Sequence, residues 1–95
     1  MFNNVDSHIF FLISEFLNSK SKDEFIKNLD KIIEICDTEL TLEVQVFTKE
    51  NDILSLIDTA KFLIKARKSN CIGMYFEVLA NIKKICENMK ALNTF

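Results

Sequence analysis

Apolar residues recur at helical spacing along most of the chain, and the most continuous such stretch lies at its centre. On a wheel of about 100° per residue, six of its residues fall within roughly 120°, the width expected of a stripe facing a core: Ile53, Leu56, Ile57, Ala60, Leu63 and Ile64. Leu54 and Phe62 lie off that arc, and Phe62 lies nearly opposite it. We predict a core helix over 52–68, capped by Asn51 or Asp52, with apolar contacts on more than one side.

Two similar helical patterns precede this stretch. The first predicts a helix over 6–18, for which Asp6 or Ser7 would be the N-cap because its side-chain oxygen can accept from an unpaired backbone N–H. The second predicts a helix over 21–36, which opens with Ser-Lys-Asp-Glu, the sequence of a capping box. Both helices carry one apolar stripe each.

A last amphipathic helix is predicted over 73–92, after a polar break that contains the only glycine. We expect Gly73 to supply a positive φ in that break, because glycine adopts it without steric cost. We expect the tail from Asn93 to Phe95 to fray.

The stretch 38–49 fits two patterns at once. Leu40, Leu42, Val44 and Val46 alternate with polar residues, as in a half-buried strand. Leu40, Val44 and Phe47 also share a helical face, and an isolated strand would leave its backbone edges unpaired. We favour a helix here and keep a strand as the alternative, which would pair with a second copy or with a partner's edge.

The composition supports an all-α class. The 95 residues include no proline and one glycine, whereas sandwiches and barrels use both residues at their turns. This length makes one domain with one core, and no apolar run is as long as a membrane helix. We therefore predict a single helical domain over 1–95, a compact bundle of four to five helices, with no membrane contact.

The chemistry-bearing residues are few and scattered. The chain has three cysteines and one histidine, with no CxxC pair, no zinc-ligand spacing and no glycine-rich phosphate loop. Unpaired cysteines are typical of a reducing compartment, so we expect a cytoplasmic protein. We predict no enzyme activity, no catalytic residue, no cofactor and no metal.

Three phenylalanines suggest a protein-binding role instead. Phe11, Phe62 and Phe76 lie off or at the edge of the inner stripes of their helices, and large apolar residues left outside a core mark contact surfaces. They could equally contact other helices of the same bundle. The resulting hypothesis is an interaction module, such as an inhibitor, immunity-type protein, adaptor or accessory subunit.

Charge is distributed unevenly along the chain. Residues 1–50 carry five lysines and ten acids, a net charge of −5, whereas residues 51–95 carry seven bases and four acids, a net charge of +3. Lys61, Lys65 and Lys68 recur at helical spacing beside Phe62 and join it as candidate partner-binding residues. A nucleic-acid-binding accessory protein that uses this basic half is the alternative function, with weaker support because no stacking aromatics or glycines accompany the lysines.

Self-association would also account for the uneven charge, since the acidic region of one chain could meet the basic region of another. We therefore expect the partner to be another protein, a second copy of the chain, or both. The high content of Lys, Asn, Ile and Phe suits an AT-rich genome, such as that of a phage, a virus or a low-GC bacterium.

Overall fold

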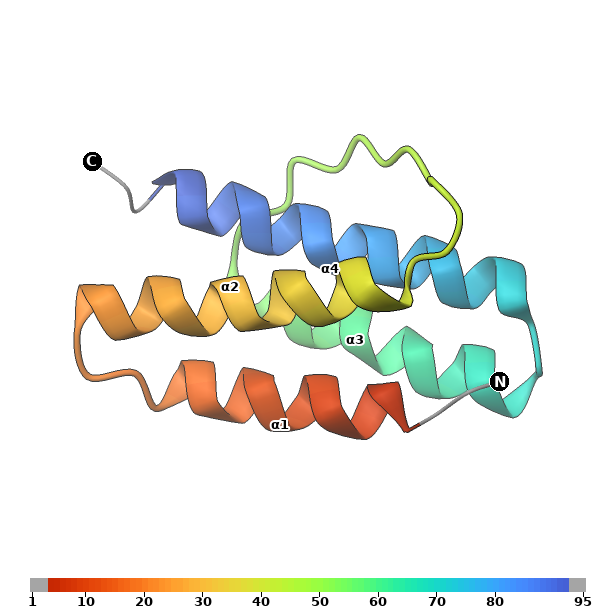
Figure 1. Cartoon of the computed structure of the whole chain (residues 1–95), viewed down its shortest axis with the longest axis horizontal. Helices are drawn as coiled ribbons and strands as arrows, with labels where there is room; N and C mark the ends of the chain where they lie inside the picture. Colours follow the sequence, from red (N-terminus) through yellow and green to blue (C-terminus); the bar gives the residue numbers. More distant parts are fainter. Residues whose placement is uncertain (1–3, 93–95) are drawn as a thin grey trace.

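The computed structural model describes residues 4–92, and four α-helices without any strand make up that part of the chain (Figure 1). The helices are α1 (Val5–Leu17), α2 (Lys22–Glu39), α3 (Ile53–Lys68) and α4 (Ile72–Leu92). The predicted all-α bundle is confirmed, with four helices. The tail from Asn93 to Phe95, which we expected to fray, lies outside the described residues.

The four helices pack as a ring in which α1 contacts α2 and α3, and α4 contacts the same two helices. Each helix runs antiparallel to both of its neighbours (Figure 1). This arrangement requires a long connection, because α2 and α3 run in the same direction from one end of the bundle to the other. Residues 40–52 provide it by passing along the outside of α4 (Figure 1). We call this segment the crossover; bundles with one long crossover are an established helical architecture.

One contiguous core fills the centre of the ring. Each helix contributes the apolar stripe that its sequence predicts, and burying one such side chain stabilises the fold by about 1.5–3 kcal/mol. On α3, Leu56, Ala60 and Leu63 are fully buried, whereas Ile53 is exposed at the start of the helix. The largest fully buried side chains come from all four helices: Ile9, Phe16, Leu29, Ile32, Leu56, Leu63, Leu79, Ile82 and Ile85.

The predicted caps of α2 and α3 are confirmed. Ser21 Oγ accepts from Glu24 N at 3.1 Å, and Asp52 Oδ1 accepts from Ser55 N at 2.7 Å. The predicted cap of α1 is wrong, because the helix begins one residue earlier and its N-cap is Asn4, with φ 56°. Asp6 instead lies inside the first turn, buried.

The prediction for Gly73 is also wrong. The residue with positive φ between α3 and α4 is Asn70, at 54°, whereas Gly73 lies inside the first turn of α4. Asparagine tolerates this conformation better than most residues because its short polar side chain can bond locally. The break is therefore shorter than predicted.

Neither prediction for 38–49 is correct. α2 continues to Glu39, and the remaining residues form neither helix nor strand and bend at Leu42. The crossover spans a distance similar to the length of α3, which has 16 residues and is about 24 Å long. Chain outside a helix covers up to about 3.3 Å per residue, so residues 40–52 reach that far without forming a helix.

Candidate interaction surfaces

The outer side of α3 carries three of the predicted binding residues. Phe62 is 46% exposed, because the stripe that closes the core lies on another side of the helix. The Lys65 ammonium lies 5.9 Å from the centroid of the Phe62 ring, near the outer limit of a cation–π contact. Lys61 lies beside them and pairs with Asp58 at 3.9 Å. We call these four residues the α3 face; it places an accessible aromatic ring among charged side chains.

Phe11 is still more exposed, at 59%, but it does not join the α3 face. An ion pair of 2.9 Å between Asp6 and Arg67 marks where antiparallel α1 and α3 meet. Phe11 follows Asp6 by five residues and Phe62 precedes Arg67 by five, so each ring is turned about 140° away from the contact between the helices. The structure therefore places these two phenylalanines on separate surfaces. Phe11 is not a contact between helices, which was one interpretation of the sequence.

The other two predicted residues are less suited to binding a partner. Phe76 is half-buried, packs against the core and meets the Tyr75 ring edge-on, with 6.0 Å between centroids. Lys68 is exposed in the last turn of α3 together with Lys65 and Arg67. Positive charge at that end complements the helix dipole. Structural roles are therefore available to both Phe76 and Lys68.

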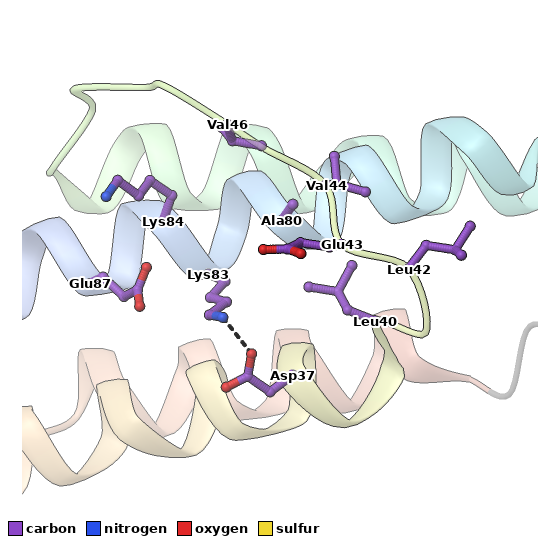
Figure 2. Close-up of a pocket in the computed structure, with 10 residues that line it drawn as sticks. All are labelled: Asp37, Leu40, Leu42, Glu43, Val44, Val46, Ala80, Lys83, Lys84 and Glu87. Carbon is purple, nitrogen blue, oxygen red and sulfur yellow. Dashed lines mark ion pairs between the residues drawn. The ribbon is translucent and has the colours of Figure 1, made fainter.

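A groove that the sequence did not predict lies between the crossover, α4 and the end of α2 (Figure 2). Its volume is about 350 Å³, and its apolar lining includes Leu40, Val44, Val46 and Ala80. An ion pair of 2.6 Å between Lys83 and Asp37 joins α4 to α2 across one side. The hydrogen bond to Asp37 is the main reason that the pKa of Lys83 is raised. The groove thus combines apolar side chains with charged ones.

The crossover is fixed at one end and unpaired along its middle. Asn88 Nδ2 of α4 donates to the carbonyls of Thr48 at 3.1 Å and Glu50 at 3.0 Å. Within the described part of the chain, the backbone of residues 41–47 makes no hydrogen bond. Phe47 is 86% exposed, and Leu42 is also exposed. The signal that could have revealed this surface was the strict alternation of Leu42, Val44 and Val46.

Charged residues from the two halves of the chain meet inside the molecule. Three ion pairs each join an acid from residues 1–50 to a base from residues 51–95: Asp6 with Arg67, Asp37 with Lys83, and Asp30 with Lys90 at 2.7 Å. The uneven charge along the sequence thus has an intramolecular explanation. It does not require self-association.

Comparisons with known proteins do not identify a family. No family model, curated protein or solved structure matches the chain. Among residues 4–92, no helix is long and apolar enough to cross a membrane, and no three His, Cys, Asp or Glu side chains gather as metal ligands would. The surfaces described above are therefore the basis for any functional proposal.

Proposed function

We propose that this protein is a small non-enzymatic interaction module, an inhibitor, immunity-type protein, adaptor or accessory subunit, that binds another protein through the α3 face. The observation that carries the proposal is the 46% exposure of Phe62 beside a core that is already closed. Aromatic residues surrounded by a polar rim are typical of the centre of an interface. Lys61 and Lys65 supply such a rim.

Crosslinking at the aromatic position tests the proposal directly. A photoreactive benzophenone amino acid in place of Phe62 should capture a discrete second protein in the source cells. The same amino acid in place of Glu77, which is exposed on α4, is the control and should not capture it. Capture of the same proteins from both positions would contradict the proposal.

Substitution separates binding from packing. Phe62→Ser should abolish this capture, measured with an affinity tag, and should change the free energy of unfolding little because the ring is nearly half in water. Phe11→Ser is the matched control, because Phe11 is also exposed, at 59%, but faces elsewhere, and it should leave capture unchanged. A loss of several kcal/mol of stability in Phe62→Ser would instead assign the ring to the core.

The nucleic-acid alternative has less support from the arrangement of charges. Arg67, Lys83 and Lys90 each pair with a carboxylate of the first half of the chain, so the basic half does not present all of its charge to a ligand. Phosphate binding strengthens as salt falls. A mobility shift with DNA or RNA at low ionic strength would favour this alternative, and the absence of one would end it.

A further inference from the structure

The middle of the crossover is backbone without a hydrogen-bond partner. Residues 41–47, which we call the edge segment, lie outside any helix, bend once at Leu42 and have no backbone hydrogen bond within residues 4–92. Burial alternates from Glu43 to Phe47: Val44 and Val46 are half-buried, whereas Glu43, Gln45 and Phe47 are exposed. Before them, Leu42 is also exposed. This period of two is that of a pleated strand with one side on a protein body. Unpaired strand backbone is a template for another strand.

We propose that the edge segments of two copies of this protein pair as antiparallel strands around a two-fold axis at Val44, forming a homodimer. The inference is independent of the proposed function, since it uses no residue of the α3 face. An isologous contact of this kind is the commonest basis of a dimer. It also supplies hydrogen bonds to backbone groups that otherwise depend on water.

The sequence of the edge segment is complementary to itself in this register. Leu42 lies opposite Val46 of the other copy, and Glu43 lies opposite Gln45. Leu42 and Val44 thus face apolar residues, Phe47 lies opposite Thr41, and no like charges meet. If the two-fold axis passed through Glu43, the two Glu43 carboxylates would lie opposite each other. If it passed between two successive residues, each half-buried residue would lie opposite an exposed residue of the other strand. This self-complementarity favours a second copy over an unrelated strand.

Charge complementarity continues beyond the ends of the strand pair. Lys49 lies just after the edge segment and Glu39, the last residue of α2, lies just before it, so the two-fold axis brings opposite charges to the same end of the strand pair. Contacts between opposite charges at such an interface mainly fix the register of the two strands and add less to the affinity. The two-stranded ribbon would also have support, because Val44 and Val46 line the groove together with Ala80 of α4 (Figure 2). A two-stranded ribbon is marginal alone but is stabilised by packing against a helix.

The dimer is tested by charge changes at one exposed position. Sedimentation equilibrium over a concentration series should show a monomer–dimer equilibrium for the unmodified chain. Gln45→Lys places a base opposite Glu43 in two symmetric pairs, which should tighten the dimer by about two- to thirty-fold, and Gln45→Glu should weaken it by a similar factor. Ser14→Lys and Ser14→Glu change the net charge equally on exposed α1 and should have little effect on dimerisation.

Hydrogen exchange locates the contact. As protein concentration rises, those amides of residues 41–47 that point toward the other copy should become protected from exchange. The exchange rates of the amides of Asp58 to Lys65 should stay unchanged. A protein that remains monomeric at millimolar concentration would overturn the proposal. A dimer whose affinity ignores the sign of the charge at position 45, or protection of the edge segment only with a different protein, would overturn it as well.

Discussion

The ion pair between α1 and α3 should respond strongly to the loss of its base. Arg67 Nη2 lies 2.9 Å from Asp6 Oδ2, and the Asp6 side chain is only 4% exposed. Its other oxygen, Oδ1, is buried and has no hydrogen-bond partner in the described part of the chain. Arg67→Met keeps much of the aliphatic stem and removes the charge. The remaining carboxylate would then be buried without a cation.

The expected cost follows from the burial of the two partners. Removing one member of a buried ion pair costs about 3–5 kcal/mol, because the other charge stays uncompensated. The Arg67 side chain is 40% exposed, so water can approach the carboxylate from that side, and we expect a cost of about 2–3 kcal/mol. For a chain of this size, that lowers the melting temperature by roughly 8–24 °C.

Urea unfolding followed by circular dichroism measures this difference. Lys90→Met is the matched control, since the Lys90–Asp30 pair is as short, at 2.7 Å, but its side chains are 38% and 51% exposed. An exposed pair contributes about 0–1 kcal/mol, so the control should lose no more than that. Asp6→Leu combined with Arg67→Met should recover most of the stability. Equal, small losses in Arg67→Met and Lys90→Met would refute the reasoning.

Three further outcomes follow from burial and anchoring. In the native protein only the exposed Cys71 thiol should react rapidly with Ellman's reagent, because Cys36 and Cys86 are buried. In urea all three thiols should react. Burial raises the pKa of Cys86 from 9.0 to about 12 and that of Tyr75 from 10.0 to about 12. The folded protein holds these protons more tightly, so the free energy of unfolding should be constant near pH 8 and fall as pH rises from about 9 to 12, seen in urea titrations. Asn88→Ala removes two hydrogen bonds to the crossover and should hasten its cleavage by a nonspecific protease while the helical circular dichroism signal persists.

Features that depend on neighbouring residues were predictable from the sequence. Ser21 and Asp52 cap their helices as expected, since a cap needs only a side chain and a backbone N–H three residues later. The apolar stripes predicted the core for the same reason. Their period fixes which side of each helix turns inward.

Features set by distant parts of the chain were not predictable. Asp6 forms an ion pair with Arg67 of α3, which lies far away in sequence, and the N-cap of α1 is Asn4 instead. The crossover runs along the bundle because α3 begins at the end opposite to the one where α2 ends (Figure 1). The exposure of Phe11 and Phe62 depends on which neighbours each helix acquires, and the wheel of a single helix does not contain that information.

The crossover also divides the molecule into two helical hairpins, α1–α2 and α3–α4, each closed by a short turn. The three ion pairs between the two halves of the sequence all join one hairpin to the other. The two halves of the sequence carry opposite net charge, −5 for residues 1–50 and +3 for residues 51–95. A chain cut between Glu50 and Asn51 would give two complementary fragments, whose reassembly would weaken with salt and could report when two attached proteins meet.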